Sequence, residues 1–286
     1  MSVGGPGALI GAGRNADVYD VGGGRVLRRY RDGREARRVE TEAEVMVRAR
    51  AAGVPVPEVF DVSGSDIVME RAVGPTMLGA FGRRPWTFRA QARLLARLHG
   101  LVHQVPASAL GGLDVPAPFG TLEPGEGDVL LHRDLHPANV ILTSGGPVII
   151  DWEGAARGPA IADVAMTWVI VRFSDVPGPR LEAFAARGVQ AAFTRSFVRA
   201  AGPVDDTWRL AIIKRRLADP NLLPAEVTRL EKLAAASRPP GTSALGERRA
   251  LGARQASGAQ QAAQEFLDRH AAFRHRRRGI GAARDD

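Results

Sequence analysis

Cysteine is absent from this sequence of 286 residues. A disulfide framework, a thiolate metal site and a cysteine nucleophile are therefore excluded. Long hydrophobic runs are also missing, since the longest, around Val164–Val171, is far too short to cross a bilayer. The first residues lack the basic region and the long apolar stretch of a signal peptide. We therefore expect a cytoplasmic protein that does not associate with membranes.

Lysine is nearly absent, because Lys214 and Lys232 are the only two. The formal net charge of +8 is therefore carried by arginine, and it is unevenly distributed. Residues 237–286 contain ten Arg against five Asp and Glu, which is +5 and leaves +3 for residues 1–236. A body so close to neutral does not indicate nucleic-acid binding, and only the basic tail favours it. The tail also has few large apolar residues, so we expect it to be disordered.

One stretch, His132–Asn139 with the sequence HRDLHPAN, carries most of the recognisable chemistry. Its Asp134 precedes an Asn by five residues, and a second Asp, Asp151, closes the apolar run Val148–Ile150. In phosphoryl transfer from a nucleotide, one carboxylate lies beside the attacking hydroxyl, while an amide oxygen and another carboxylate hold magnesium. Magnesium needs only a few hard oxygen ligands besides phosphates and water. The spacing therefore predicts a phosphotransfer site, with a polar turn between two strands as the alternative.

A glycine-containing segment, Gly11–Val18, follows the pattern G-x-G-x-x-G-x-V with Ala at the third glycine. Glycines let the backbone turn tightly and bring its N–H groups close to phosphates. The residues around Gly22–Gly24 alternate as in a β-hairpin, so we expect the segment to lie between two strands. A dinucleotide-binding loop would instead open a helix, so this arrangement argues against a Rossmann site.

Hydrophobic periodicity and turn residues predict the other elements. A helix over residues 34–52 and a second hairpin over residues 58–70 complete a five-stranded antiparallel sheet with one helix. A linker at residues 71–75 leads to a mainly helical part. Its predicted helices cover residues 87–103, 163–172, 179–201, 206–219 and 224–235, and its predicted loops cover residues 104–127 and 152–159.

In combination, these features resemble the aminoglycoside phosphotransferase and choline kinase-like family, the small-molecule relatives of protein kinases. The resemblance covers about residues 8–235. It rests on the glycine segment, Glu42 in EAEVM, the VME before the linker, HRDLHPAN, IID and Asp163. The family fold implies an α+β, two-lobed protein kinase-like architecture. The N-lobe would span residues 1–72, the C-lobe residues 73–236 and the tail residues 237–286, with the nucleotide between the lobes.

The resemblance implies a role for each matching residue. Asp134 would be the catalytic base toward a hydroxyl of a small molecule, and Asn139 and Asp151 would bind Mg²⁺. ATP, with GTP as the alternative, would be held by the glycine segment at Gly11 and Gly13, and its adenine by backbone groups near the linker, at Met69, Glu70 and Arg71. Asp163 and His132 would support the catalytic loop.

The lysine that normally holds the phosphates in this family is missing, because no Lys precedes position 214. The third strand aligns with Val26–Leu27–Arg28, which puts Arg28 in the lysine position, paired with Glu42. Neighbouring registers would use Arg29, or Glu40 and Glu44. Arginine keeps the positive charge but is longer and planar. We expect an active enzyme because the base and metal positions are complete, and a nucleotide-binding pseudokinase or scaffold is the alternative.

The acceptor and the oligomeric state are left open by the sequence. In the family, C-terminal helices, here residues 165–235, form the acceptor pocket, and four carboxylates there are candidates to meet a cationic acceptor: Asp175, Asp205, Asp206 and Asp219. His99 and His103 lie four residues apart, as in some metal pairs. No acidic residue accompanies them in the sequence, so we expect helix packing or surface positions.

Overall fold

The computed structural model describes residues 7–13, 15–31, 35–118, 128–173, 180–218, 222 and 224–236. The disorder predicted for residues 237–286 and the acceptor candidates Asp175 and Asp219 lie outside these residues. None of the helices in the described part is long and apolar enough to cross a membrane. Residues 1–234 form one compact unit, so the predicted division at residue 72 stays a prediction.

The N-terminal part is a five-stranded antiparallel sheet with the order β1-β2-β3-β5-β4. Its strands are β1 (Ala8–Ala12), β2 (Ala16–Gly22), β3 (Arg25–Tyr30), β4 (Val59–Ser63) and β5 (Asp66–Glu70). The turn between β2 and β3 needs glycine, because Gly22, Gly23 and Gly24 have φ of 77°, 60° and 72°. The sheet predicted from the two hairpins is confirmed.

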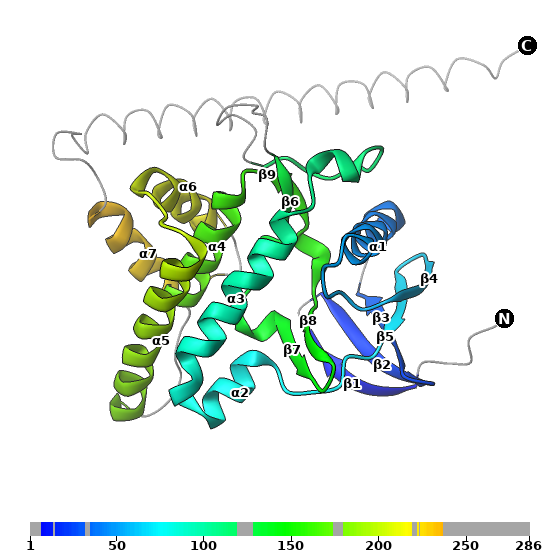
Figure 1. Ribbon diagram of the computed structural model, residues 1–286, viewed down its shortest axis with the longest axis horizontal. Coiled ribbons are helices and arrows are strands. Elements are labelled where there is room, and N and C mark those ends of the chain that lie inside the picture. The colour runs from blue at the N-terminus through cyan, green and yellow to red at the C-terminus, as the bar shows by residue number, and fades with distance from the viewer. Residues whose placement is uncertain are drawn as a thin grey trace, which may run out of the picture. The chain divides into compact units, whose positions relative to one another are not determined.

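Helix α1 (Ala36–Ala51) lies against β4 and β5 (Figure 1). Val39, Ala43 and Met46 recur every three or four residues and are buried, which is the spacing of one helix face. Glu42 is buried on the same side of the helix, so the core-facing stripe carries a charge into the sheet region. Gly53 follows the end of the helix, and its φ of 88° is most easily adopted by a residue without a Cβ.

The C-terminal part is mainly helical, with α3 packed against α5 and α4 against α6 (Figure 1). The helices are α2 (Met77–Arg83), α3 (Phe88–His103), α4 (Ala160–Phe173), α5 (Arg180–Ala201), α6 (Asp206–Leu217) and α7 (Pro224–Ala236). Two small antiparallel pairs accompany them: β6 (Val129–Leu131) with β9 (Ala156–Gly158), and β7 (Val140–Thr143) with β8 (Gly146–Ile149).

Three parts of the sequence-based prediction differ from this structure. Helix α2 was not predicted, although Thr76 caps it by accepting a hydrogen bond from the Gly79 N–H at 3.0 Å. Helix α4 begins three residues before the predicted start at residue 163. The predicted loop at residues 152–159 contains a 3₁₀ turn, Trp152–Gly154, and strand β9. A three-residue strand is defined by its partner β6 and has no periodicity of its own.

Candidate active site

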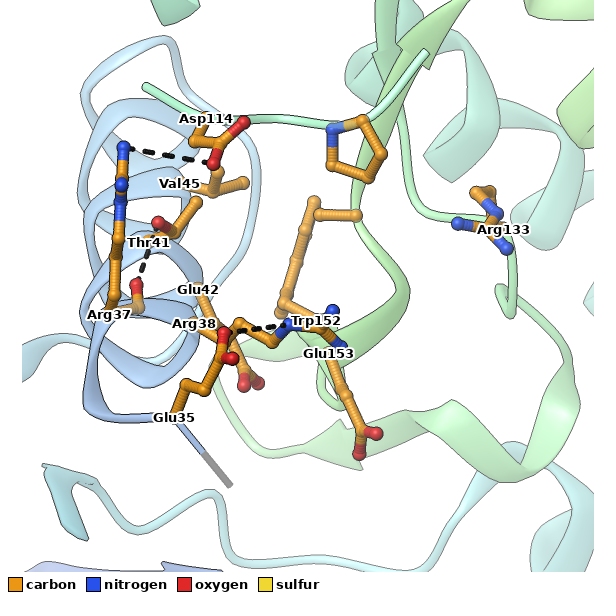
Figure 2. Close-up of a pocket in the computed structure, with 12 residues that line it drawn as sticks. Glu35, Arg37, Arg38, Thr41, Glu42, Val45, Asp114, Arg133, Trp152 and Glu153 are labelled. Atoms are coloured by element: carbon orange, nitrogen blue, oxygen red, sulfur yellow. Dashed lines mark hydrogen bonds and ion pairs between the residues drawn. The ribbon is translucent and has the colours of Figure 1, made fainter. Parts of the chain in front are cut away.

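A cavity of about 400 Å³ lies beside α1 and marks where the two parts of the chain approach each other (Figure 2). Its wall includes Glu42 from α1, together with Arg133, Trp152 and Glu153 from the C-terminal part. Two of these lining residues are sequence neighbours of predicted catalytic residues, since Arg133 precedes Asp134 and Trp152 follows Asp151.

The β7–β8 hairpin brings the two predicted metal ligands together. Val140 pairs with Ile149, and the Ile150 N–H donates to the Asn139 carbonyl at 3.0 Å. Asn139 and Asp151 therefore lie at the open end of the same hairpin, although twelve positions separate them in the sequence. Asp151 has a φ of 68°, so the chain turns sharply as it leaves β8.

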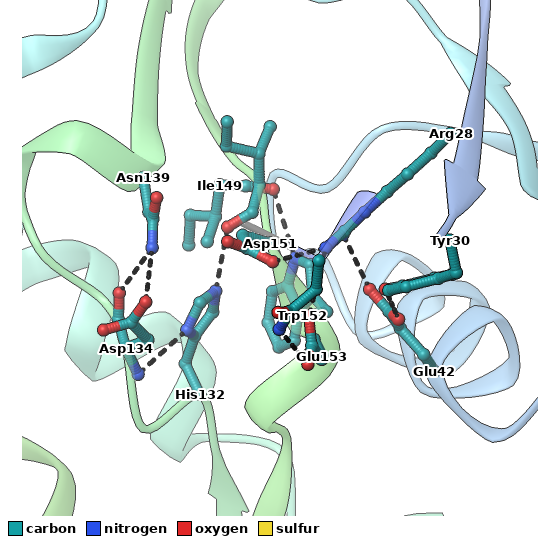
Figure 3. A network of polar contacts seen from close by, with 12 residues as sticks. Arg28, Tyr30, Glu42, His132, Asp134, Asn139, Ile149, Asp151, Trp152 and Glu153 are labelled. Carbon is teal, nitrogen blue, oxygen red and sulfur yellow. Dashed lines mark hydrogen bonds and ion pairs between the residues drawn. The ribbon is translucent and has the colours of Figure 1, made fainter. Parts of the chain in front are cut away.

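Asn139 is tied to the predicted base Asp134 (Figure 3). Its Nδ2 donates to the Asp134 carbonyl at 2.9 Å and to the Asp134 Oδ2 at 3.0 Å. Because an ionised carboxylate only accepts hydrogen bonds, the amide nitrogen must face Asp134. The Oδ1 of Asn139 is thereby directed away from the base, in the orientation that a metal ligand requires.

The electrostatic surroundings of Asp134 favour its ionised form. Burial raises its pKa, but a hydrogen bond from His136 and the nearby charge of Arg216 lower it more, so the net shift is downward from 3.8. His136 Nε2 lies 3.5 Å from Asp134 Oδ1. Asp134 is consequently a carboxylate at neutral pH and is able to accept a proton.

Asp163, at the start of α4, holds the catalytic loop from below. Its fully buried carboxylate accepts hydrogen bonds from the His132 N–H at 3.1 Å and from the Arg133 N–H at 2.6 Å. Arg133 has a φ of 67°, a left-handed conformation that is costly for a residue with a side chain. The charged acceptor offsets that cost. The supporting role that the resemblance implies for Asp163 thus has a physical basis.

His132 braces the same loop through its ring. Its Nδ1 accepts a hydrogen bond from the Asp134 N–H at 3.3 Å, so its Nε2 carries the proton and donates to the Ile150 carbonyl at 3.1 Å. The ring packs on Trp152, with centroids 4.6 Å apart. Burial lowers the pKa of His132, which keeps the imidazole neutral. One side chain therefore connects the base to the segment that carries Asp151.

The expectation that His99 and His103 lack an acidic partner is wrong. Asp163 Oδ2 lies 3.1 Å from His103 Nε2 and 3.6 Å from His99 Nδ1. The partner comes from α4, sixty residues further on, so sequence proximity does not reveal it. The Asp163 carboxylate already accepts two backbone hydrogen bonds, and burial lowers the pKa of His99 to about 4. We assign the two histidines to the support of the catalytic loop.

Arg28 occupies the position expected of the missing lysine. Its Nη1 donates to Glu42 Oε1 at 2.9 Å and its Nη2 to Asp151 Oδ1 at 2.6 Å (Figure 3). Burial disfavours its charge, but the proximity of Glu42 and Asp151 raises the pKa of Arg28 above its ordinary value. The neighbouring registers are excluded, because Arg29 binds Asp66 on another part of the sheet and Glu44 binds Arg48 on the surface.

Tyr30 and Glu153 belong to this network, and the sequence analysis missed both. The Tyr30 hydroxyl donates to Glu42 Oε2, and its ring lies 4.9 Å from the Arg28 guanidinium. Glu153 Oε2 lies 3.7 Å from Arg28, and Glu153 Oε1 accepts a hydrogen bond from Asn15 at 2.9 Å. The latter contact brings the glycine segment to the site. The sequence contained a signal for each residue. Tyr30 is two residues after Arg28 in a strand, so the two side chains share one face of the sheet. Glu153 is a carboxylate only two residues after Asp151.

Some of the backbone groups that were predicted to contact the nucleotide already have hydrogen-bond partners within the protein. Gly11 lies within β1, and the Gly13 N–H donates to the Ala16 carbonyl at 2.8 Å, which forms the turn of the glycine segment. The N–H groups of Glu70 and Arg71 donate to Glu58 and Gly24 carbonyls, both at 2.8 Å. An adenine held by backbone groups at Met69–Arg71 would therefore have to use other atoms than these two N–H groups, and that contact stays a prediction.

Two of the acceptor candidates have structural partners. Asp205 caps α6 by accepting a hydrogen bond from the Trp208 N–H at 2.8 Å, and Asp206 binds Arg209 at 2.8 Å. Neither carboxylate needs a cationic acceptor to explain its position. In contrast, the last turn of α6 is basic, with Lys214, Arg215 and Arg216.

The donor set at the hairpin fits a magnesium ion. Asn139 Oδ1 and the carboxylates of Asp151 and Glu153 are hard oxygen ligands, and Mg²⁺ in phosphotransfer sites uses one or two carboxylates besides phosphates and water. Arg28 contacts only one oxygen of Asp151, so the other oxygen is available to an ion.

Comparison with known proteins decides the family. The sequence pattern of the phosphotransferase enzyme family matches residues 7–125 and 116–201, well over half of the chain. The chain belongs to the phosphotransferase enzyme family. Membership is consistent with the arrangement of Arg28, Glu42 and Asp151 around one site, and it makes kinase-type phosphotransfer the chemistry of this fold.

Two proteins with similar sequences match only part of this phosphotransferase. A probable bifunctional tRNA threonylcarbamoyladenosine biosynthesis protein from Methanoculleus marisnigri is 29% identical over 163 residues, which are 53% of this chain and 25% of that protein. A probable serine/threonine-protein kinase BUD32 homolog from Archaeoglobus fulgidus is 39% identical over 69 residues, which are 23% of this chain and 34% of that protein. The chain thus matches about a quarter of the first relative's length and about a third of the second's.

Solved structures confirm the protein kinase-like α+β fold. Aminoglycoside phosphotransferase APH(4)-Ia superimposes with a TM-score of 0.56 at 19% identity, covering 82% of this phosphotransferase and 93% of that chain. The GDP complex of an aminoglycoside 2′-phosphotransferase-IIIa mutant gives a TM-score of 0.53 at 16% identity, covering 83% and 92%. At this level of identity the similarity establishes the fold alone.

The hydrogen bond from Tyr30 to the buried Glu42 generates a stability prediction. Tyr30→Phe leaves a buried carboxylate without its neutral donor and should lower the free energy of unfolding by about 2 kcal/mol, measured by urea denaturation. Tyr19→Phe is the matched control, because no described residue hydrogen-bonds to the Tyr19 hydroxyl. Equal decreases in the free energy of unfolding of both variants would show that the hydrogen bond from Tyr30 to Glu42 does not stabilise the fold.

The buried Asp163 generates a pH prediction. Its hydrogen bonds and neighbouring histidines hold its pKa below the ordinary 3.8, so its charge stabilises the fold fully above about pH 4. That contribution is lost as the pH falls toward the folded pKa. Asp163→Asn should lower the free energy of unfolding by about 3 kcal/mol at pH 7. The difference in unfolding free energy between the variant and the unmodified protein should be about 1 kcal/mol smaller at pH 3. Each pH unit below the unfolded pKa removes about 1.4 kcal/mol of the stability that the charge contributes.

The control for this comparison is Asp61→Asn, which alters an exposed carboxylate on β4. It should leave the unfolding free energy almost unchanged at both pH values. A gap for Asp163→Asn that is as wide at pH 3 as at pH 7 would contradict the assignment of a buried, ionised carboxylate.

Proposed function

We propose that this protein is an ATP- and Mg²⁺-dependent phosphotransferase that moves the γ-phosphate to a hydroxyl of a small molecule, with GTP as the alternative donor. The observation that carries the proposal is the convergence of a base, two metal ligands and a buried cation at one site, from β3, α1 and the β7–β8 region. A relative solved with AMP-PNP and hygromycin B, and another with GDP, support a nucleotide and a small-molecule acceptor.

Asp134 takes the role of general base in this proposal. Its ionised carboxylate accepts the proton of the acceptor hydroxyl as the oxygen attacks the γ-phosphorus. Asn139 keeps the carboxylate in place through Oδ2, and His132 fixes the backbone N–H of the same residue. The loop therefore presents the base in one orientation, which is the main contribution a protein makes to phosphoryl transfer.

Mg²⁺ would be held by Asn139 and Asp151, with Glu153 as a further oxygen ligand, and would neutralise phosphate charge when bound. Arg28 contacts Asp151, and its planar, positively charged guanidinium can bind phosphate oxygens. Glu42 and Tyr30 hold that guanidinium in position. Gly13 would bring backbone N–H groups toward the phosphates.

Asp134→Asn tests the base. The variant should keep nucleotide binding and lose transfer by about 100-fold to 10,000-fold, because the amide no longer accepts a proton. The measurement is Mg²⁺-dependent phosphate transfer from labelled ATP across a panel of alcohols and aminoglycosides, with nucleotide affinity measured in parallel. Asp114→Asn, at a carboxylate that is 74% exposed, is the control and should leave transfer unchanged. Transfer by Asp134→Asn at the unmodified rate would remove the assigned base.

Arg28 separates the active enzyme from the alternative, a nucleotide-binding pseudokinase or scaffold. Arg28→Met should lower kcat/KM for ATP by about 100-fold, since displacement of a phosphate by about 1 Å has that effect. Arg28→Lys keeps the charge but reaches one carboxylate at a time, so it should fall between Arg28→Met and the unmodified protein. If the unmodified protein binds Mg²⁺ and nucleotide but neither hydrolyses nor transfers phosphate, the pseudokinase alternative replaces the proposal.

A further inference from the structure

A second cavity, of about 480 Å³, lies between α4, α5 and α6, and the charged residues that line it are all arginines. Four of its nine lining residues are arginines, and none is an Asp or a Glu. They are Arg172 from α4, Arg195 and Arg199 from α5, and Arg209 from α6. None of these residues hydrogen-bonds to Asp134 or Asp151 in the described part of the chain, although the cavity lies within residues 165–235, where the resemblance places the acceptor pocket.

The cavity beside α1 allows the charge balance of two arginine-containing cavities to be compared within this protein. It is also lined by arginines, but carboxylates accompany them: Arg37 lies 3.7 Å from Asp114, and Arg38 lies 3.7 Å from Glu35 (Figure 2). Its charges are therefore balanced within the protein. The abundance of arginine in the sequence is thus not enough to explain a cavity that has four arginines and no acid.

The arginines of the second cavity are poorly neutralised. Arg172, Arg195 and Arg199 form no hydrogen bond or ion pair within the described part of the chain. Arg209 donates from Nη1 to Asp206 at 2.8 Å, and its buried Nε has no hydrogen-bond partner. Like charges gathered in one cavity repel one another, although solvent screens the repulsion among the exposed Arg172, Arg195 and Arg199. A bound anion would relieve this repulsion and supply the missing acceptors.

Two of the four guanidinium groups lie over aromatic rings before any ligand arrives. Arg209 lies over the Trp168 ring at 5.1 Å from its centroid, and Arg172 over the Phe173 ring at 5.4 Å. Arg195 and Arg199 are one helical turn apart on α5, so they project from the same face. At Arg172 and Arg209, binding therefore costs less additional side-chain entropy, which favours affinity.

We propose that this cavity binds a small polyanion that carries phosphate groups. A planar guanidinium fork matches the oxygen pairs of a phosphate, and each such hydrogen bond is charge-assisted. Four guanidinium groups on three helices provide more positive charge than one carboxylate neutralises, whereas a phosphate group carries nearly two negative charges. A molecule with two phosphates fits the charge of the arginines. The proposal is independent of the catalytic roles proposed for Asp134 and Arg28.

The test is calorimetric titration of the full chain with inorganic pyrophosphate, in EDTA and at low ionic strength. Without a metal, the carboxylates of Asp134, Asp151 and Glu153 disfavour binding of an anion at the phosphotransfer site. The double variant Arg195→Gln/Arg199→Gln should bind pyrophosphate about tenfold more weakly. Both side chains are exposed on α5, so the fold should persist, and circular dichroism melting checks this.

The matched control is the double variant Arg37→Gln/Arg38→Gln, which removes two exposed charges of one helix from the charge-balanced cavity. Its affinity for pyrophosphate should stay within about twofold of the unmodified protein. Equal weakening in both double variants would reduce the effect to net charge and overturn the proposal. So would unchanged affinity in Arg195→Gln/Arg199→Gln, or loss of binding in Arg28→Gln alone. Citrate is titrated in parallel, and equally tight binding of citrate would overturn the assignment to phosphate.

Discussion

The guanidinium of Arg28 connects three segments of the chain through charge. It joins strand β3 to α1 through Glu42 and to the end of β8 through Asp151. Removing Arg28 would leave Glu42, which is only 4% exposed, as a carboxylate without a cation. The geometry of the phosphate side of the site and the placement of α1 therefore depend on the same ion pair. A lysine, with one ammonium group, would not hold both carboxylates in this fixed planar arrangement.

The opposite side of the site depends on a second buried charge. Asp163 fixes two consecutive backbone N–H groups of the catalytic loop, while His132 links the loop to the Ile150 carbonyl. Thr167, one helical turn after Asp163, donates to the Leu135 carbonyl at 2.7 Å, so α4 holds the loop at two levels. Apart from Arg172 in its last turn, α4 is otherwise apolar, so the buried Asp163 and Thr167 specify how the loop lies on it. Base and metal ligands thus share one rigid support.

Arginine has two different uses in this protein. At Arg28 it is buried and paired on both sides, with Glu42 and with Asp151. In the cavity between α4, α5 and α6, arginines converge with little internal compensation. The contrast follows from where carboxylates lie: they come from neighbouring segments at Arg28 and are absent from the second cavity's lining. The near absence of lysine means that both sites rely on planar, bidentate donors.

The sequence by itself determined the features that arise from local spacing. The two hairpins, helix α1, and the HRDLHPAN loop with Asp151 after an apolar strand all follow from spacing, periodicity and turn residues, whereas the choice of Glu42 came from the family resemblance. Tertiary structure decided what depends on segments far apart. Strand β9 exists through its pairing with β6, His99 and His103 meet Asp163 across sixty residues, and Glu153 joins the site through Arg28 and Asn15. Likewise, four arginines from three helices form one cavity only after those helices pack, because no local pattern encodes which faces meet.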